Sequence, residues 1–316
     1  MSKQKTYMIT GGAGFIGSHL VREALQRGFN VVVVDNFVTG KKENLAGVIS
    51  DIDLVQGDIR DKELMDRLCG RCDVILHQAA LRSVPRSVDD PASSNDCNVT
   101  GTLNLLIAAR DNGVQRLVYA SSSSVYGDTP SLPKREEQRP LPISPYAVSK
   151  LAGEHYCRAF SHTFGLETVS LRYFNVFGPR QDPESKYSAV VPIFFKQAIE
   201  GSPLSVHGDG KQSRDFTYVK NVVSANFLAA EAAGVSGEVF NVACGNRYSV
   251  LDIAAEVLKN TSSDVAMKHG ERRKGDVEHT QADISKAERM LGYKPSVDFY
   301  EGMRLSASAY MKEKKK

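Results

Sequence analysis

A tyrosine and a lysine four residues apart, Tyr146 and Lys150, have the chemistry and spacing of a proton-transferring pair. Ser144 and Pro145 precede them, and these residue types favour the N-cap and the first position of a helix, so the pair is predicted to share one helix face. An ammonium group near a phenol lowers the pKa of the tyrosine from about 10 toward the range of a general base. The pair is therefore predicted to take a proton from an alcohol during hydride transfer, although the spacing alone also fits a tyrosine packed beside a surface lysine.

A glycine-rich turn follows the first predicted strand. Gly11 allows a tight turn, Gly14 lets the backbone approach a pyrophosphate, and Gly17 permits close packing of a helix on a strand. The N-terminus of that helix offers N–H groups to phosphate oxygens. Asp35 ends the next strand, Val31–Val34, where a carboxylate can accept both ribose hydroxyls of adenosine and repels a 2′-phosphate, so the sequence predicts NAD rather than NADP.

Two points near this turn leave alternatives open. Asp58 and Ile59 follow the third predicted strand and could contact adenine, but an aspartate there also fits a plain cap. A glycine cluster followed by a capping aspartate is likewise a common turn without a ligand.

Strands and helices alternate through the first half of the chain, which predicts a doubly wound parallel sheet. The expected strands are Tyr7–Thr10, Val31–Val34, Leu54–Val55, Val74–His77, Leu117–Ser121 and Thr168–Asn175, and the expected helices are Phe15–Arg27, Lys62–Leu68, Thr102–Asn112 and Tyr146–Phe164. After Gly178 the elements become shorter, while a helix at Val219–Ala233 and a strand at Gly237–Val242 return to the sheet. Residues 1–177 with about 217–243 are thus expected to form a cofactor domain, and about 178–216 with 244–316 a second, smaller one.

Composition excludes several classes of protein. The chain has 316 residues with 40 Lys plus Arg and 37 Asp plus Glu, a net charge of +3, which is too balanced for nucleic-acid binding. No apolar run approaches the ~18 residues of a membrane span and no signal region is evident, so we expect a soluble, cytoplasmic protein without membrane contact. Cys69 and Cys72 have the spacing of a redox motif or half a zinc site, but no second pair follows and the histidines lack ligand spacing, so we expect no metal.

These features together resemble the signature of the short-chain dehydrogenase/reductase superfamily, in particular its extended branch, which modifies nucleotide sugars. The resemblance covers nearly the whole chain and includes the segments His77–Ala80, Asn98–Thr102, Ser121–Gly127, Leu171–Pro179, Gly208–Phe216 and Arg273–Asp276. It implies a Rossmann sheet with a smaller α/β region that binds a UDP-sugar, NAD as cofactor, and a homodimer formed through the helices at Thr102–Asn112 and Tyr146–Phe164.

The resemblance also assigns individual site residues. It places Ser121, Tyr146 and Lys150 around the nicotinamide ribose. It gives the substrate diphosphate to Asn175, Arg214 and Arg273, which suit charge-assisted bonds to phosphate. The other cofactor residues that it implies are Phe15, Ile16, Asn36, Ala79, Ala80, Asn98 and Tyr173, and the other substrate residues are Arg82, Ser83, Ser122, Ser123, Tyr146, Gln181, Ala189, Val190, Leu204, Asp276 and Thr280.

The residues before Tyr126 discriminate among reactions of this branch. Its dehydratases carry Asp-Glu, and its sugar decarboxylases a glutamate, where this chain has Ser122, Ser123 and Ser124, so no carboxylate is placed to move a proton at C5. What is left resembles a UDP-hexose 4-epimerase. In that mechanism Tyr146 takes the O4 proton while hydride passes from C4 to NAD, Ser122 binds O4, and hydride returns to the other face of a 4-keto sugar.

Two positions bear on which sugar is bound. Thr280 and Ala189 are small where bulkier residues restrict the pocket, and this resembles epimerases that accept UDP-N-acetylglucosamine, while UDP-glucose also fits such a pocket. Arg82 departs from that group, which has glycine there, and an arginine can pair with a C6 carboxylate. Arg82 could equally be a solvated surface residue. Three other functions therefore stay open: a UDP-hexuronate 4-epimerase, a UDP-hexuronate decarboxylase or dehydratase, and a non-catalytic dinucleotide-binding protein.

Overall fold

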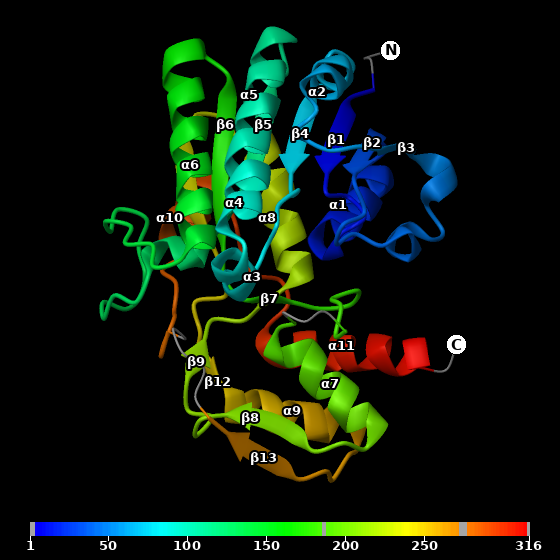
Figure 1. Ribbon diagram of the computed structural model, residues 1–316, viewed down its shortest axis with the longest axis vertical. Coiled ribbons are helices and arrows are strands. Elements are labelled where there is room, and N and C mark those ends of the chain that lie inside the picture. Colours follow the sequence, from blue (N-terminus) through cyan, green and yellow to red (C-terminus); the bar gives the residue numbers. More distant parts are fainter. Residues whose placement is uncertain (1–3, 185–187, 272–276, 315–316) are drawn as a thin grey trace.

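The computed structural model describes residues 4–184, 188–271 and 277–314 (Figure 1). At its centre lies a seven-stranded parallel sheet in the order β11-β6-β5-β4-β1-β2-β3. Its strands are β1 (Thr6–Thr10), β2 (Asn30–Asp35), β3 (Asp53–Gln56), β4 (Val74–His77), β5 (Arg116–Ser122), β6 (Glu167–Tyr173) and β11 (Glu238–Val242). The predicted doubly wound sheet is confirmed. The strand expected at Thr168–Asn175 ends at Tyr173, and Asn175 has a positive φ of 31°, outside the extended region.

Helices cover both faces of this sheet. On one face lie α1 (Phe15–Gln26) and α8 (Val219–Glu231), and on the other α2 (Lys62–Cys69), α5 (Gly101–Asp111) and α6 (Pro145–Phe164). In β2, Val31 and Val33 pack into the core beneath α1, whereas Val32 and Val34 pack into the core beneath α2 and α5. Because successive strand residues point to opposite faces, a run of valines predicts a strand buried on both sides.

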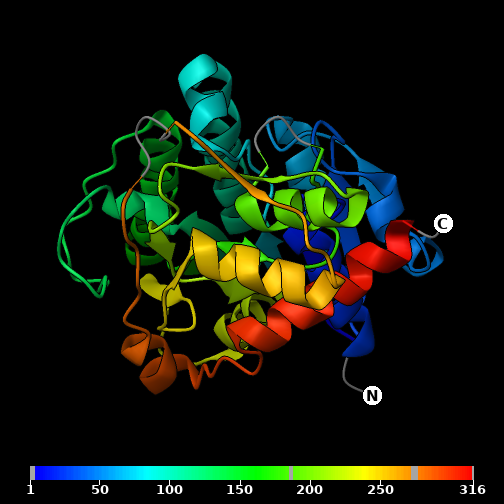
Figure 2. The ribbon, with the colours of Figure 1, turned by 90° about the horizontal axis from the view of Figure 1, so that it is seen from below.

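The second region lies below the carboxyl ends of the strands. It contains α7 (Val190–Glu200), α9 (Val250–Thr261), α11 (Phe299–Lys314) and the parallel pair β8 (Leu204–His207) and β13 (Met267–Gly270). Seen from below, α9 and α11 pack side by side across this end of the molecule (Figure 2). Although α10 (Ser285–Leu291) is close to the C-terminus, it packs against β11 and α8 at the edge of the large sheet.

Short elements complete the chain. They are η1 (Lys42–Leu45), η2 (Ile49–Asp51), α3 (Val84–Asp89), α4 (Pro91–Asn95), the π-helical turn η3 (Asp96–Thr100), η4 (Ser123–Tyr126), β7 (Val176–Phe177), β9 (Ser213–Arg214), β10 (Thr217–Tyr218) and β12 (Tyr248–Ser249). In the described ranges, no helix combines the length and apolar character that crossing a bilayer requires.

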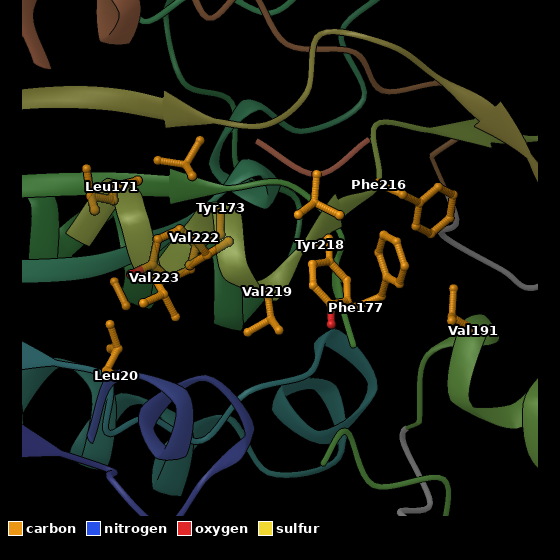
Figure 3. Close-up of a cluster of buried hydrophobic side chains, with 14 of the residues drawn as sticks. Leu20, Leu171, Tyr173, Phe177, Val191, Phe216, Tyr218, Val219, Val222 and Val223 are labelled. Atoms are coloured by element: carbon orange, nitrogen blue, oxygen red, sulfur yellow. The ribbon is translucent and has the colours of Figure 1, made fainter. Parts of the chain in front are cut away.

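A single hydrophobic core joins the two regions. Leu20 of α1 and Leu171 of β6 belong to the same buried cluster as Phe177, Tyr218 and Val191, the last of which is in α7 (Figure 3). Because buried apolar surface is the main stabilising contribution in folding, this continuity fixes the second region against the sheet. The second region and the sheet, which enclose the cleft, are therefore held together by shared buried side chains.

Candidate active site

A cavity of about 570 Å³ lies at the carboxyl ends of β1, β2, β4 and β5, between the sheet and the second region. Ligands of open α/β sheets bind at this edge. The cavity brings together most of the cofactor residues predicted from the sequence and three of the substrate residues. Those that line it are Gly11, Gly14, Phe15, Ile16, Gly17, Asp35, Asn36, Ile59, Ala79, Ala80, Arg82, Ser83, Ser121, Tyr146, Lys150 and Tyr173.

The glycine turn leaves no room for side chains. A Cβ on Gly17 would lie 2.2 Å from Gly11 O. Gly11 has a φ of 68°, and a Cβ added to it would lie only 2.8 Å from the backbone of Ala79. Gly14 is the N-cap of α1 and lines the cavity, so the helix N-terminus opens onto it. This close backbone cradle with a helix N-terminus suits a pyrophosphate, and the turn fits a dinucleotide.

Asp35 is held in place in the wall of the cavity. Its carboxylate is 7% exposed and accepts hydrogen bonds from the backbone N–H groups of Ala13 at 2.9 Å and Phe37 at 2.8 Å. Burial raises the pKa of Asp35, and these two bonds oppose that effect. A Cβ on Gly40 would lie 2.6 Å from Asp35 Oδ1, so the loop closes tightly over the carboxylate. The position fits its predicted role toward a ribose.

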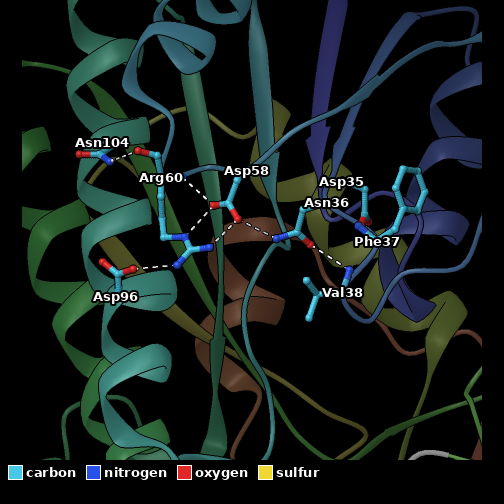
Figure 4. A network of polar contacts seen from close by, with 8 residues as sticks. All are labelled: Asp35, Asn36, Phe37, Val38, Asp58, Arg60, Asp96 and Asn104. Atoms are coloured by element: carbon cyan, nitrogen blue, oxygen red, sulfur yellow. Dashed lines mark hydrogen bonds and ion pairs between the residues drawn. The ribbon is translucent and has the colours of Figure 1, made fainter.

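Asp58 belongs to a different network (Figure 4). Its Oδ1 accepts from the backbone and the Nε of Arg60, and its Oδ2 accepts from Arg60 Nη2 and Asn36 Nδ2, all at 2.8–2.9 Å. These bonds hold the pKa of Asp58 well below its usual range, and Arg60 continues to Asp96 at 2.8 Å. A carboxylate has about four acceptor sites, and here all are used. The arrangement favours a structural brace for Asp58, while Ile59 faces the cavity.

Tyr146 and Lys150 both line the cavity, but their contacts differ from the prediction. Lys150 Nζ donates to Ala120 O at 2.9 Å and lies 5.0 Å from the centre of the Tyr119 ring. Burial raises the pKa of Tyr146, while a hydrogen bond with Ser122 and the positive charge of Arg82 lower it. Arg82 thus adds a positive charge near Tyr146, and the Lys150 ammonium donates to the backbone of β5.

The serines at the end of β5 are also engaged. Ser121 Oγ donates to Glu154, and Ser122 Oγ lies 2.6 Å from Ser124 Oγ. Glu154 itself is paired with Arg172, so the carboxylate behind this strand end is not free to move a proton. The sequence prediction missed Glu154, although its signal was present as the next step of the four-residue repeat that starts at Tyr146.

Three predicted substrate residues converge away from this cavity. Asn175 Nδ2 lies 3.4 Å from Thr280 Oγ1, and Thr280 N donates to Ser213 O at 3.0 Å, beside Arg214. The guanidinium of Arg214 donates to Glu278 O at 2.8 Å. Segments more than 100 residues apart thus meet at this point, and these three side chains do not line the cavity. Arg273 and Asp276 lie outside the described residues.

The other predicted residues have structural surroundings. Asn98 is buried, and its amide exchanges hydrogen bonds with the backbone N–H and C=O of Leu81 at 2.8 and 3.0 Å, so it positions the cavity wall. Leu204 is part of the core. Gln181 is buried and donates to Val176 O at 3.2 Å, and its Oε1 has no hydrogen-bond partner in the described part of the chain. The remaining three are exposed or half-buried and do not line the cavity: Ser123, Ala189 and Val190.

Two contacts across the cavity were missed by the sequence prediction. Lys41 Nζ lies 3.0 Å from Asp182 Oδ2, and Arg180 Nε donates to Ser18 Oγ at 2.9 Å. Lys41, Arg180 and Asp182 line the cavity, and they join the cofactor loops to the first turn of the second region. Their types are common surface residues, so only their placement reveals this role.

Comparison with known proteins places this site in a family. The profile of the NAD dependent epimerase/dehydratase family matches residues 7–243. UDP-glucose 4-epimerase from Mycolicibacterium smegmatis is 37% identical over 300 residues, or 94% of this chain and 95% of that protein. The UDP-N-acetylglucosamine 4-epimerase of Methanobrevibacter ruminantium M1, solved with UDP-N-acetylmuramic acid, is 38% identical with a TM-score of 0.94 and coverage of 98% and 99%. UDP-glucuronic acid 4-epimerase from Bacillus cereus, solved with UDP-glucuronic acid and NAD, is 32% identical with a TM-score of 0.90 and coverage of 98% and 99%.

Proposed function

The chain belongs to the NAD dependent epimerase/dehydratase family, and we propose that within this family it is an isomerase that inverts C4 of a UDP-sugar. The observation that carries this proposal is the serine run at the end of β5: Ser122 lowers the pKa of Tyr146, and Ser123 and Ser124 stand where other family reactions need a carboxylate. Both carboxylate oxygens of Glu154, behind this strand, accept hydrogen bonds from Arg172. Proton transfer at O4 is therefore supported, and proton transfer at C5 is not.

The residues around the cavity divide this work. NAD, when bound, supplies a hydride acceptor at C4 of the sugar and then a hydride donor. Tyr146 takes the proton from O4 and returns it, and Ser122 keeps the phenol and O4 in hydrogen-bond reach. Lys150, fixed on Ala120 O, presents its ammonium to the ribose side of the cavity. The cycle begins and ends with the same oxidation state, so no second redox substrate is needed.

For the sugar, we propose UDP-N-acetylglucosamine and its C4 epimer UDP-N-acetylgalactosamine, with UDP-glucose and UDP-galactose as further substrates. Thr280 is a small side chain beside Asn175, at 3.4 Å, and Ala189 is a small side chain at the N-cap of α7. A 2-acetamido group needs volume that a tyrosine at position 280 would fill. Size alone supports this choice.

The test incubates purified protein, without added cofactor, with UDP-N-acetylglucosamine, UDP-glucose and UDP-glucuronate separately and follows the anomeric protons by NMR. We expect the C4 epimer to appear, fastest with the N-acetylated sugar, and Tyr146→Phe to abolish it. Retention of NAD without turnover of any sugar, even with NAD supplied, would instead favour a non-catalytic dinucleotide-binding protein.

A second candidate is epimerisation of a UDP-hexuronate. It is favoured by Arg82, which lines the cavity and whose positive charge lowers the pKa of Tyr146. The guanidinium of Arg82 makes no hydrogen bond or salt bridge with another described residue. A C6 carboxylate on a sugar held at O4 by Tyr146 lies within reach of such a cation. Faster epimerisation of UDP-glucuronate than of UDP-N-acetylglucosamine supports this candidate. Carbon dioxide release from UDP-glucuronate supports a decarboxylase.

We also propose a homodimer formed through α5 and α6. Val148 and Phe164 on α6 are 52% and 50% exposed, and exposed aliphatic and aromatic side chains on a packed helix favour a protein partner. Analytical ultracentrifugation of the parent and of Val148→Glu tests the dimer, since a buried charge should shift the sedimentation coefficient toward the monomer.

The five cysteines are free thiols, which suits a reducing compartment such as the cytoplasm.

A further inference from the structure

Helix α6 carries a functional residue at every fourth position. Tyr146, Lys150 and Glu154 follow one another at the spacing that places residues on one helix face. Consecutive residues of β5 hold the last two, because Lys150 Nζ donates to Ala120 O at 2.9 Å and Ser121 Oγ donates to Glu154 Oε1. The reactive face of α6 is thus tied to the end of β5 residue by residue.

Glu154 is also half of an ion pair inside the protein. Its Oε1 and Oε2 accept from Nε and Nη2 of Arg172 at 2.9 and 2.8 Å, and the two side chains are 3% and 4% exposed. The guanidinium carbon of Arg172 lies 4.7 Å from the centre of the Tyr126 ring. Arg172 comes from β6, so the pair joins the catalytic helix to both strands beneath it.

Stability is a weak reason to keep such a pair. Removing two charges from water costs several kcal/mol per ion, and apolar replacements of buried pairs are often neutral or stabilising. Arg172 Nη1 adds to this cost, because it is buried without a hydrogen-bond partner in the described part of the chain. What the pair does provide is geometry, since the forked guanidinium fixes both carboxylate oxygens and thereby the Ser121 hydroxyl.

We propose that Glu154 and Arg172 are positioning residues for the reaction: they fix the end of β5 against α6, and they hold a carboxylate one helical turn from Lys150 on the same helix face. The inference rests on the proposed function for the roles of Lys150 and Tyr146. Neither Glu154 nor Arg172 contacts the cavity, so they act through the residues that do.

The charges around Lys150 show why Glu154 matters. Burial lowers the pKa of Lys150 to about 8, and Cys97, Cys157 and Glu154 oppose this. Burial raises the pKa of both thiols, to about 12 for Cys157, so both are uncharged at neutral pH. Burial also lowers the pKa of the neighbouring His77 to about 3, which leaves its ring neutral. Of these groups, Glu154 is the one that forms an ion pair, with Arg172.

The experiment compares Glu154→Gln with the parent holoenzyme. The glutamine keeps the shape of the side chain and removes its charge, so the alkaline limb of the kcat profile should move to lower pH by roughly half to one unit, with kcat at neutral pH reduced about tenfold or more. An independent readout is NMR of lysine labelled at Cε, with Lys150→Met assigning the signal. The titration midpoint of Lys150 should fall by the same amount.

A second variant separates charge from position. Glu154→Asp keeps the charge but is one methylene too short for Ser121, so kcat should fall while the alkaline limb stays in place. Glu23→Gln, on the surface of α1, is the matched control and should change neither. The inference is overturned if folded Glu154→Gln keeps the parent's alkaline limb in the kcat profile and the parent's titration midpoint for Lys150, even if its melting temperature drops. An inactive parent whose Lys150 midpoint still falls in this variant overturns the proposed function and leaves the inference standing.

Discussion

In the cofactor half of the site, the functional residues stand at the ends of parallel strands, whereas in the substrate half they stand in loops and two-residue strands. Gly11 follows β1, Asp35 ends β2 and Ala79 follows β4, and all line one cavity. Asn175 and Arg214, by contrast, lie beside β7 and in β9. Thr280 is joined to them by single hydrogen bonds, one from Asn175 and one to Ser213, the neighbour of Arg214.

This difference shows where the position of a residue in the sequence predicts its position in the site. Strands of a parallel sheet end at a common edge, so residues just after them must converge. Loops have no such register, and residues in them converge only because the shared core holds the second region in place. The cofactor half should therefore fail through backbone clashes, and the substrate half through changes in pocket volume.

The largest expected effect is at the reacting atoms, which both halves serve. Tyr146→Phe removes the phenol that exchanges a proton with O4, so kcat should fall by roughly 10²–10⁴. NAD affinity and melting temperature should stay near parental values, because Lys150 keeps its bond to Ala120 O. Steady-state turnover, NAD titration and thermal unfolding measure these quantities. A variant with more than a tenth of parental kcat would show that another group takes the proton.

The next effect breaks the cofactor half alone. In Gly17→Ala the new Cβ would lie 2.2 Å from Gly11 O, a backbone atom that cannot move aside cheaply. The turn must shift, so NAD affinity should fall about 100-fold or more, while UDP affinity, measured by calorimetry, should change little. Gly28→Ala is the matched control at the far end of α1, where the added Cβ has no neighbour within 4 Å, although its φ of 79° carries a local strain cost. Equal losses of NAD and UDP binding in Gly17→Ala would contradict the separation of the halves.

The third effect breaks the substrate half alone. Thr280→Tyr fills volume next to Asn175, so turnover of UDP-N-acetylglucosamine should fall by about 10- to 100-fold relative to UDP-glucose. NAD affinity should be unchanged because Thr280 does not line the cofactor cavity. Thr280→Ser, which stays small, is the control. Parallel losses for both sugars would remove the argument from pocket size.

Much of the fold and of the cofactor half could be predicted from the sequence. The valine run of β2 shows burial on both faces, and the glycines and Asp35 reveal the dinucleotide turn because each residue type has a narrow steric or electrostatic reason. The strand at Thr168–Asn175 was predicted too long, since a chain turn at Asn175 leaves no mark in local hydrophobicity.

Side-chain partners could not be predicted in the same way. Spacing places Lys150 on the face of Tyr146, yet it does not show that the backbone of β5 offers the ammonium a carbonyl, or that Arg82 adds a positive charge near the tyrosine. Likewise, Asp58 follows a strand as an adenine contact would, but Arg60, two residues later, takes most of its acceptor sites. Such choices depend on three-dimensional neighbours.

A fourth effect is a dependence on pH that both halves share. Because burial lowers the pKa of Lys150 to about 8, the ammonium is present below this pH and lost above it. At pH 9 roughly a tenth of it is left, so kcat should decline about tenfold between pH 7 and pH 9. A profile at saturating sugar checks this. A flat profile to pH 10 would mean that the charge on Lys150 is not needed.

The smallest expected effect is at the contact between the two halves, where Lys41 Nζ lies 3.0 Å from Asp182 Oδ2 and both residues line the cavity. The side chains are 48% and 26% exposed, and a surface pair of this kind contributes about 0–1 kcal/mol. Lys41→Met should therefore speed NAD release by at most about fivefold, an increase that high salt reproduces in the parent by screening the pair. Stopped-flow release of NADH measures the rate. Asp182→Asn in the Lys41→Met background should not change the NAD release rate further, since one partner of the pair is already gone. An additive effect would show that the two residues act separately. The two halves would then be held together by other contacts, such as Arg180 with Ser18.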